Sequence, residues 1–502
     1  MTPELLLNKN HLVEVLQKPA HEFTKSDIID YVKSQGIEMI NFMYPAGDGR
    51  LKTLNFVINN LSYLDTILSF GERVDGSSLF AHIEPGNSDL YVLPRFRTAF
   101  LDPFAEIPTV TMLCTFFDKD GNRLENSPEY TLEKACKAFR DTTGLQFEAM
   151  GELEFYVIAP DDETYPATDQ RGYHESAPFA KFNEFRTRCM SYIAATGGQI
   201  KYGHSEVGNF TINGTIYEQN EIEFLPVRAE DAADQLVVAK WIIRNLAHEM
   251  GYTVTFAPKI TTGKAGSGLH IHMRFTDPNG QNVMLDSTRH LSDDARRAIA
   301  GMMEMAQSIT AFGNTNPTSY FRLVPHQEAP TNICWGDRNR SVLVRVPLGW
   351  TAQADMCALI NPGSQATGGS TTQKQTVEIR SADGSADIYF LLAALAVACR
   401  QGWEMENALG KAQATYVDVD IHRAENADKL NSLDHLPASC SESADCLQKA
   451  RDIYEAKGVF DPRMIDDTIS RLKAFDDAEL VTRARADEKL MTELVNRYFH
   501  CG

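Results

Sequence analysis

Apolar and polar positions recur along the chain with two different spacings, and these spacings predict where helices and strands lie. After Ser127 and Pro128, which are typical of a helix start, Leu132, Ala135, Cys136 and Phe139 recur at helical spacing, and Gly144 predicts the stop. Further helices are expected near 26–35 and at about 230–250, 293–312 and 386–407. Strand-like stretches such as TVTMLCTFF, EFYVIAP and YTVTFAP alternate irregularly with them, which favours an α+β fold over regular βαβ units.

The clearest boundary along the chain falls in residues 118–128, DKDGNRLENSP. Asp120 and Gly121 predict a turn after the strand TVTMLCTFF, and the helix that begins at Pro128 follows. With 502 residues, of which 43% are hydrophobic, the chain can bury a large core and form two domains or more.

Charge and cysteine content narrow the class of protein. The net charge of −20 excludes a nucleic-acid backbone or an anionic membrane surface as the expected partner and favours cations. The nine cysteines include no C-x-x-C pair, so neither a disulfide framework nor a zinc knuckle is indicated. The N-terminus lacks the features of a signal peptide, and the apolar run 388–399 is too short to span a bilayer. We therefore expect a cytoplasmic protein.

Four strand-like pieces carry pairs of chemically active residues two positions apart, where side chains share a face. These pairs are Glu152 and Glu154 in GELEF, Glu221 and Glu223 in EIEF, His270 and His272 in HIH, and Glu378 and Arg380 in VEIR. Any one pair is more often only the solvated face of a strand. Together they form a set rich in carboxylates, with imidazoles and without thiolates, which suits Mg²⁺ or Mn²⁺ better than zinc.

Arginines form a second group of candidate site residues. Arg338, Arg340 and Arg345 lie within RNRSVLVRVP, with Arg322 upstream and Arg380 downstream. Guanidinium groups bind phosphate and carboxylate through two hydrogen bonds at once, whereas the simpler interpretation is a set of surface salt bridges. Metal ions and arginines together are what phosphoryl transfer requires. The chain contains no GxxxxGK[ST] motif and no kinase-type signature, so a nucleotide would be held in another way.

Eight motifs, read in order, resemble those of the glutamine synthetase family from about residue 25 to near the end. They are VDGSS (74–78), GELEF, GHSEV (203–207), QNEIEF, KAGSGLHIH (264–272), RLVPHQEAP (322–330), RNRSVLVRVP and VEIR. The resemblance implies a β-grasp N-terminal domain at 25–122 and a catalytic domain at 127–502, whose antiparallel sheet is flanked by helices. It also implies a homo-oligomer, a dodecamer in the bacterial type I enzymes, with each active site between the N-terminal domain of one subunit and the catalytic domain of its neighbour.

The resemblance assigns roles to individual residues. One metal ion would be held by Glu154, Glu206 and Glu221, and the second, nearer to the nucleotide, by Glu152, His270 and Glu378, with Mg²⁺ or Mn²⁺ as the ion. His272, Arg340 and Arg345 would contact the phosphates of ATP, and Arg340 is also assigned to catalysis. Gly266, Arg322 and Arg380 would bind glutamate. Asp75 would bind and help to deprotonate ammonium in the adjacent subunit, and the catalytic Glu328, on a mobile flap, would close the site and take a proton. Glu223 has no assigned role.

Several positions depart from the family pattern. Ala265 stands where many bacterial relatives have an asparagine, Arg274 replaces a serine two residues after the second histidine, and the arginine expected just before VEIR is absent, with Lys374 nearby. Residues 207–220 make the interval between Glu206 and Glu221 longer than usual, and the insertion could reshape the acceptor pocket. His422 occupies the position of the regulatory tyrosine of the enterobacterial enzymes, so we expect no nucleotidylation there.

Three hypotheses follow. The first is ATP-dependent ligation of glutamate and ammonia to glutamine through a γ-glutamyl phosphate. The second is γ-glutamyl ligation of a larger amine such as a polyamine, methylamine or ethanolamine, which Ala265 and the insertion keep open, whereas the intact VDGSS favours ammonia. The third is an inactive scaffold. Six retained candidate metal ligands argue against it, because a scaffold has no need of carboxylates that repel one another. A metal-dependent phosphatase would not explain the arginines together with Asp75.

Overall fold

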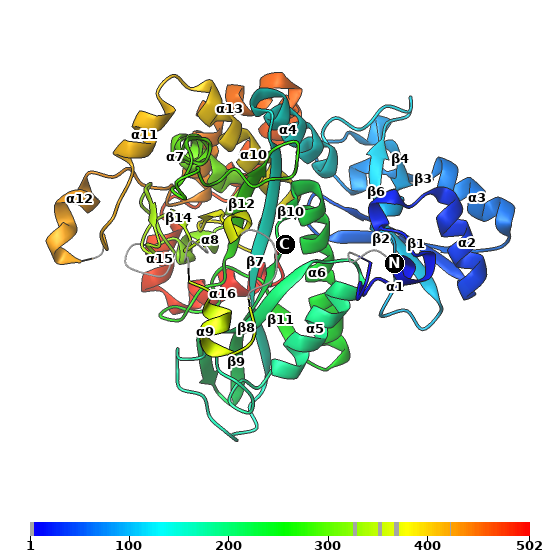
Figure 1. The fold of residues 1–502 in the computed structure, drawn as a ribbon, viewed down its shortest axis with the longest axis horizontal. Coiled ribbons are helices and arrows are strands. Elements are labelled where there is room, and N and C mark those ends of the chain that lie inside the picture. The colour runs from blue at the N-terminus through cyan, green and yellow to red at the C-terminus, as the bar shows by residue number, and fades with distance from the viewer. Residues whose placement is uncertain (1–4, 325–328, 350–353, 366–370, 422) are drawn as a thin grey trace.

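The computed structural model describes residues 5–324, 329–349, 354–365, 371–421 and 423–502. Figure 1 shows a smaller N-terminal part beside a larger part that contains most of the helices. Two main apolar cores correspond to them: one gathers residues between Leu12 and Phe116, and the other extends from Leu132 to Leu472 and also includes Met43, Phe100 and Leu113. The expected α+β class is confirmed.

The N-terminal part is built around one mixed sheet with the strand order β2-β1-β6-β4-β3. Most neighbouring strands are antiparallel, but β1 and β6 pair in parallel. The strands are β1 (Met39–Pro45), β2 (Leu51–Val57), β3 (Glu72–Asp75), β4 (Asp89–Pro94), β5 (Phe100–Leu101) and β6 (Thr109–Phe117). The helices are α1 (His11–Leu16), α2 (Lys25–Gln35) and α3 (Leu61–Phe70).

The larger part contains a sheet with the order β13-β14-β15-β12-β7-β9-β8, in which β10 and β11 also pair with β7. Its strands are β7 (Gln146–Pro160), β8 (Ile200–Ile212), β9 (Thr215–Phe224), β10 (Val227–Arg228), β11 (Thr253–Thr255), β12 (Leu269–Thr276), β13 (Trp335–Asp337), β14 (Val344–Val346) and β15 (Val377–Ile379). The pairing is antiparallel except between β13 and β14. The expectation of an antiparallel sheet therefore holds for all but this edge pair.

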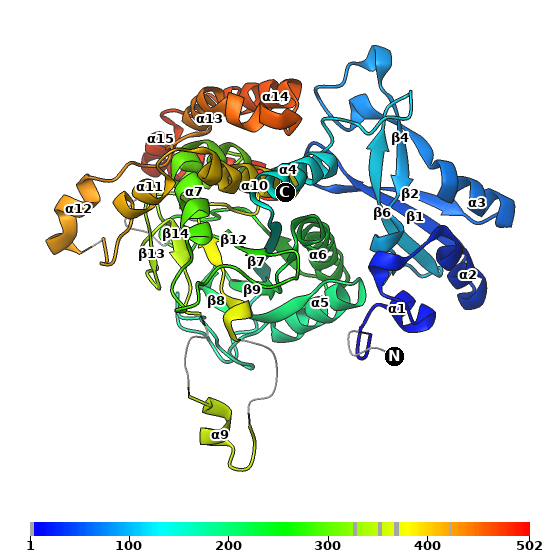
Figure 2. The same ribbon diagram turned by 45° about the horizontal axis from the view of Figure 1, so that its top comes forward.

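Helices flank the sheet in Figure 2: α4, α5 and α6 pack against its strands, and α10 packs against α4, α6 and α7. They are α4 (Pro128–Thr143), α5 (Asn183–Ala195), α6 (Ala229–Glu249), α7 (Asp293–Gly313), α8 (Ser319–Arg322), α9 (Met356–Ile360), α10 (Ile388–Glu404), α11 (Ala408–Ala414), α12 (Ala427–Asn431), α13 (Cys440–Glu455), α14 (Pro462–Lys473), α15 (Leu480–Ala486) and α16 (Glu488–Tyr498). Strand residues such as Leu153, Ile271 and Met273 belong to the same apolar core as these helices. Because side chains alternate along a strand, their neighbours Glu152 and His272 project to the opposite face.

The helices predicted from the sequence are confirmed within one or two residues at most ends. Gly144 ends α4 in the left-handed conformation (φ +75°), and Asp118 to Asn122 form the predicted turn. Ser127 occupies the N-cap position, but its hydroxyl donates to Glu129 instead of capping the helix. Only Thr253–Thr255 of the predicted strand YTVTFAP is a strand.

Buried ion pairs join the two parts. Arg95, which follows β4, donates two hydrogen bonds of 2.8 Å to Asp234 on α6, and the Tyr389 hydroxyl donates a third to the same carboxylate. Arg97 adds an ion pair to Asp231. Burial alone would raise the pKa of Asp234, but Arg95 and Arg97 outweigh it and lower that pKa. None of the helices in the described residues combines the length and apolar character needed to span a bilayer.

Candidate functional site

The strand register brings the four predicted residue pairs onto adjacent rows of one sheet. On β7, Glu152 lies opposite His270 of β12 and Glu223 of β9, and Glu154 lies opposite Glu221. On the next strand, His272 of β12 lies opposite Glu378 of β15. Residues two apart share a face of a strand, so segments that are more than 200 residues apart in the chain meet on one surface.

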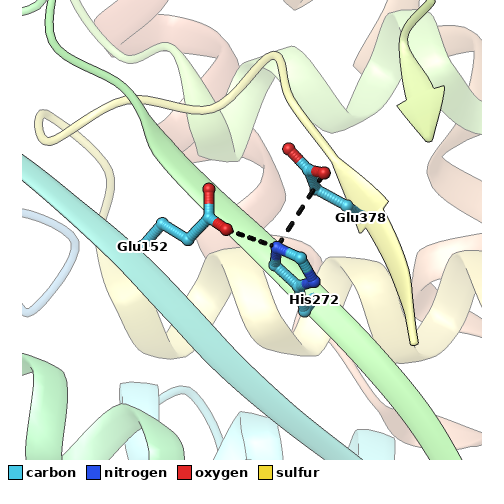
Figure 3. Close-up of side chains that lie close together, drawn as sticks. All are labelled: Glu152, His272 and Glu378. Carbon is cyan, nitrogen blue, oxygen red and sulfur yellow. Dashed lines mark hydrogen bonds and ion pairs between the residues drawn. The ribbon is translucent and has the colours of Figure 1, made fainter. Parts of the chain in front are cut away.

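The first cluster joins β7, β12 and β15 (Figure 3). Nε2 of His272 lies 2.8 Å from Oε1 of Glu152 and 3.9 Å from Oε2 of Glu378. Nδ1 of His270 lies 3.0 Å from Oε2 of Glu152 and 3.5 Å from Oε1 of Glu378. Ligand atoms of Glu152, His272 and Glu378 all lie within 4.8 Å of one another, which is close enough for one metal ion. His270, assigned by resemblance to the metal, and His272, assigned to phosphate, thus both contact the same carboxylates.

The second cluster lies on β8 and β9. Nε2 of His204 is 3.5 Å from Oε1 of Glu221, and its Nδ1 is 4.0 Å from Oε1 of Glu206. Ligand atoms of His204, Glu221 and Glu223 form a second group within 4.8 Å. Glu154 is buried beside them and accepts a hydrogen bond of 2.6 Å from the Gly268 amide. The sequence reasoning gave His204 no role, although its position two residues before Glu206 carried the same signal as the other pairs.

A long bulge positions Glu206. Between Ser205 and Asn209, β8 has two more residues than the facing part of β9, so Glu206, Val207 and Gly208 fall in the irregular stretch. The insertion noted in the sequence is the outer end of this β8–β9 hairpin, which turns at Asn213 and Gly214, both with positive φ. The two clusters line one cavity, whose other residues are given below. None of the described residues on its wall comes from 208–218, so the end of the hairpin does not form part of that wall.

Buried carboxylates set the electrostatics of the site. Burial raises the pKa of Glu221 well above its usual value. The negative charges of the neighbouring carboxylates raise that pKa further; these are Glu152, Glu154, Glu206 and Glu223. For Glu152, burial alone would raise the pKa, but His272 and His270 outweigh it and hold that pKa well below its usual value. Oxygen ligands with an imidazole, crowded enough to repel one another, fit a hard divalent cation, which would neutralise them.

The arginines surround Glu378. Nη1 of Arg345 lies 2.9 Å from Oε2 of Glu378, and Nε of Arg380 lies 3.1 Å from its Oε1. Arg380 also donates to the carbonyl of Arg340. Arg322 donates to the carbonyls of Ser381 (2.8 Å) and Arg380 (3.2 Å). A Cβ on Gly266 would lie 2.6 Å from the Pro258 carbonyl oxygen and 3.1 Å from Arg322, so glycine allows this close packing.

These groups line one cavity of about 980 Å³. The predicted residues on its wall are Glu152, Glu154, Glu206, Glu221, Gly266, His270, His272, Arg322, Arg338, Arg340, Arg345 and Arg380, and Glu378 is buried in contact with them. Tyr173, Lys201, Tyr202, His204, Glu223 and Lys259 also line it, although the sequence reasoning gave them no role.

Asp75 does not line this cavity. It ends β3 in the N-terminal sheet, away from β12 and β14 in Figure 1, and accepts hydrogen bonds from the hydroxyls of Ser77 (2.7 Å) and Ser78 (2.6 Å). The hydroxyls of Ser78, Ser77 and Ser88 lower the pKa of the exposed Asp75 carboxyl, so it is ionised at neutral pH. Glu328 and His422 lie outside the described residues.

Comparison with known proteins shows to which family the chain belongs. The sequence profile of the glutamine synthetase catalytic domain matches residues 125–489, and that of the glutamine synthetase β-grasp domain matches residues 36–119. The chain belongs to the glutamine synthetase family. It is thus an ATP-dependent carbon–nitrogen ligase of a family that uses divalent metal ions, and its two clusters are suitable places for them.

Individual relatives agree with this assignment. Glutamine synthetase from Frankia alni is 28% identical over 488 residues, covering 88% of this chain and 94% of the relative. That from Methanosarcina mazei is 29% identical over 444 residues, covering 87% and 91%. Among solved structures, Plasmodium falciparum glutamine synthetase has a TM-score of 0.74 at 19% identity (91% and 96% covered), and a GmaS/ADP complex has 0.73 at 19% (92% and 99%). A structural similarity at 19% sequence identity shows that the fold is shared.

Proposed function

We propose that this member of the glutamine synthetase family joins the γ-carboxylate of glutamate to ammonia, with ATP as the co-substrate. The observation that carries the proposal is the cavity itself, which crowded carboxylates and five arginines line, and whose space is large enough for two substrates. Carboxylates in such a cavity can hold cations while the arginines bind phosphates, and phosphoryl transfer to a carboxylate requires both.

In the proposed site, Glu154, Glu206 and Glu221 hold one divalent ion, and Glu152, His270 and Glu378 hold another. When bound, Mg²⁺ or Mn²⁺ neutralises the phosphate oxygens and the carboxylates around them. His272, Arg340 and Arg345 orient the phosphates of ATP, while Gly266, Arg322 and Arg380 receive glutamate. The side-chain carboxylate of glutamate then attacks the terminal phosphorus, ADP leaves, and a γ-glutamyl phosphate remains.

The second step needs free ammonia, because ammonium has no lone pair for attack. Asp75 of a neighbouring subunit attracts ammonium and accepts its proton. Its low pKa keeps the carboxylate charged, which favours attraction of the cation but makes Asp75 a weak base. Ammonia attacks the acyl carbon, the nitrogen of the tetrahedral adduct gives up a proton to Glu328, and the adduct collapses to the amide as inorganic phosphate leaves. Glu328, on a flap that closes the site, excludes water that would hydrolyse the acyl phosphate.

A larger amine is the second candidate acceptor. Ala265 presents no polar side chain, and its backbone groups are occupied, since its amide donates to Gln170 and its carbonyl accepts from Tyr156. Tyr173 and Tyr202 line the cavity and are half exposed, at 50% and 42%. His174 stacks on the Tyr173 ring, and Lys201 Nζ lies 4.7 Å from the centre of the Tyr202 ring, a cation–π contact that an organic cation could take over.

The test is phosphate release by the purified protein with ATP, Mg²⁺ or Mn²⁺ and glutamate, with each amine in turn and the product identified by mass. Stimulation by ammonium with glutamine as product is the expected result. Stimulation only by a larger amine would replace ammonia with the second candidate. No release with any acceptor would overturn both.

A further inference from the structure

One buried side chain, that of Gln219 on β9, lies between the candidate metal ligands and the loop that leads into β12. Gln219 shares a face of its strand with Glu221, two residues further on, and it is 1% exposed on the wall of the main cavity. Its carboxamide forms hydrogen bonds on both sides, and the partners come from three separate segments of the chain. The sequence reasoning placed Gln219 in the motif QNEIEF but gave it no role.

The partners of the Gln219 carboxamide determine which way it is turned. The backbone N–H of Gly208 can only donate, and its nitrogen lies 3.0 Å from Oε1, so the oxygen of Gln219 faces the irregular stretch that contains Glu206. Nε2 therefore faces the other side, where it donates to the carbonyl of Gly266 (2.9 Å) and to Oε2 of Glu154 (3.2 Å). One side chain thus contacts a proposed metal ligand, the stretch that carries another, and the loop residue assigned to glutamate.

The hydrogen bonds to Glu154 leave one of its two oxygens facing the cavity without a donor. Oε2 of Glu154 accepts from Nε2 of Gln219 and from the amide of Gly268 (2.6 Å). In the part of the chain that the structure describes, no donor is bonded to Oε1 of Glu154. Nε2 of Gln219 also lies 3.3 Å from Oγ of Ser267, next to Gly268 in the same loop. Hydrogen bonds that orient a carboxylate in this way prepare it to bind a metal ion.

We propose that Gln219 is a positioning residue, which holds Glu154, the stretch with Glu206, and the loop at Gly266 in one arrangement. One side chain then sets the affinity for both a divalent ion and glutamate. The inference rests on the proposed function, which assigns the ion to Glu154 and Glu206 and glutamate to Gly266. Because the three segments come from different parts of the chain, a shift of one of them is passed to the others through this carboxamide.

The residues proposed to bind ATP are not held by Gln219. In the described parts of the chain, Gln219 has no hydrogen bond with His272, Arg340 or Arg345. The register also separates them, since Gln219 lies opposite Tyr156 of β7, whereas His272 lies opposite the neighbouring strand β15. Loss of the carboxamide should therefore weaken the binding of one metal ion and of glutamate and leave the binding of ATP unchanged.

The competing interpretation is that Gln219 only satisfies buried backbone groups. Without its carboxamide, the amide of Gly208 and the carbonyl of Gly266 each lose a partner, so either interpretation predicts lower stability. They differ in selectivity. A purely structural role predicts that the affinities for the metal ion, glutamate and ATP all fall together or all stay the same, whereas a positioning role predicts that only the first two fall.

The experiment compares the wild type with Q219M, which keeps the length of the side chain and removes the amide, and with Q235M as a matched control. Gln235 is also buried (8% exposed), and its Oε1 accepts from a backbone amide, that of Gln199 (2.9 Å), but it lies on α6 and does not line this cavity. Three calorimetric titrations measure the affinities without turnover: Mn²⁺ alone, glutamate with Mn²⁺ present, and ATP with Mg²⁺ present.

Q219M should bind one Mn²⁺ per chain and glutamate about fivefold to tenfold more weakly than the wild type, the effect of losing neutral hydrogen bonds, and should bind ATP equally well. Q235M should match the wild type in all three titrations. Equal affinities of Q219M and Q235M for Mn²⁺ and glutamate would overturn the proposal. A loss of ATP affinity in Q219M as large as the other two losses would also overturn it, in favour of the structural role.

Q219E provides the test if Q219M does not fold. It keeps the size of the side chain and an acceptor for the Gly208 amide, but its carboxylate cannot donate to the Gly266 carbonyl. Glutamate should bind more weakly to Q219E than to the wild type, and an unchanged affinity would overturn the proposal. If the wild type binds Mn²⁺ but no glutamate, the proposed reaction is wrong. A selective loss of Mn²⁺ affinity in Q219M then still establishes the positioning role at the metal ligands, whereas equal Mn²⁺ affinity refutes it.

Discussion

Glu221 shows how the candidate metal ligands oppose one another when no cation is bound. Its folded-state pKa lies above the unfolded value, so the folded protein binds more protons there. The metal-free protein therefore loses stability as pH rises from the unfolded-state pKa of Glu221 toward its higher folded-state pKa. At the residue scale, the same carboxylate that would bind a divalent ion lowers the stability of the protein when the ion is absent.

We predict that Glu221→Gln unfolds at a higher temperature than the wild type at pH 7.5 without metal, because the variant removes one of the repelling charges. Mn²⁺ should raise the unfolding temperature of the wild type and have little effect on the variant, which lacks a ligand. Thermal unfolding with and without Mn²⁺ measures both effects. Glu133→Gln, an exposed carboxylate on α4, serves as the control. A variant that is destabilised yet keeps the full Mn²⁺ response would contradict this role.

The sequence predicted which side chains share a face of a strand better than it predicted which residues they meet on neighbouring strands. Alternation along each strand was enough to place Glu152 with Glu154 and His270 with His272 on one face. Which acid meets which histidine depends on the register between strands far apart in the chain, and spacing along one strand does not determine that. The contact of both histidines with Glu152 and the grouping of His204 with Glu221 and Glu223 therefore required the structure.

At the scale of elements, the β8–β9 hairpin places a close contact of the Gly208 backbone near Glu206, a candidate metal ligand. An added Cβ on Gly208 would lie 2.0 Å from the Tyr156 hydroxyl, and Gly208 is in the same irregular stretch as Glu206. We expect Gly208→Ala to lower stability by roughly 1–3 kcal/mol and to weaken Mn²⁺ binding, because the stretch must shift to relieve the overlap.

Gly214→Ala is the matched control in the same hairpin. Gly214 has a φ of +74° and nothing near its missing Cβ, so alanine there should cost about 1–2 kcal/mol through backbone conformation alone. Chemical unfolding and Mn²⁺ titration of both variants separate the effects. Equal Mn²⁺ affinity in the two would show that the stretch does not position Glu206.

Helix α10 offers a pH-dependent test at its N-terminus. Asp387 caps the helix by accepting a hydrogen bond from the Phe390 amide (3.1 Å), and burial raises the pKa of its carboxyl to about 6. The pKa of an aspartate in the unfolded chain is about 3.9. Because the folded-state pKa is higher, the protonated acid adds stability at low pH, and this contribution is lost as pH rises toward 6. Asp387→Asn keeps a good capping residue without the charge.

We therefore expect Asp387→Asn to be more stable than the wild type at pH 8, and the difference to shrink below pH 5. Its size should be roughly 1 kcal/mol, because the side chain is only partly buried and water screens its charge. Unfolding temperatures at the two pH values provide the measurement. A difference that is independent of pH would indicate that ionisation of Asp387 has no part in it.

Long elements were the most predictable from sequence. Helical spacing located α4, α6, α7 and α10, because a helix that buries one face repeats its apolar residues over many turns. The β8–β9 hairpin was recognised only as an insertion, although Asn213 and Gly214 form the dipeptide most typical of a tight hairpin. Short strands such as β13 and β15 are defined by their partners and carry too few residues to show a period.

At the scale of the whole molecule, the role proposed for Asp75 requires an active site that two subunits share. The side chain lies on the N-terminal sheet outside the cavity, and the described residues that line the cavity all belong to the larger part. The buried contacts of Arg95 with Asp234 hold the N-terminal sheet to its own α6, so a neighbouring subunit is the natural source of this acid.

We predict that Asp75→Asn and Arg340→Ala are each nearly inactive and that co-expressed, mixed oligomers recover activity. Random mixing of equal amounts gives both intact halves at about a quarter of the shared sites. Activity of co-purified mixtures, compared with the separately purified variants mixed after assembly, tests this. No recovery in oligomers shown to contain both chains would place Asp75 outside the site.

The candidate ligands on β7, β8, β9, β12 and β15 also have a consequence for how long the protein survives in a cell. Two divalent ions held by them would together connect five strands contributed by distant parts of the chain, and such a connection resists local opening of the sheet. When metal is scarce, these strands should separate more often and become accessible to proteases. The abundance of the enzyme would then follow the supply of metal through degradation, without any change in its synthesis.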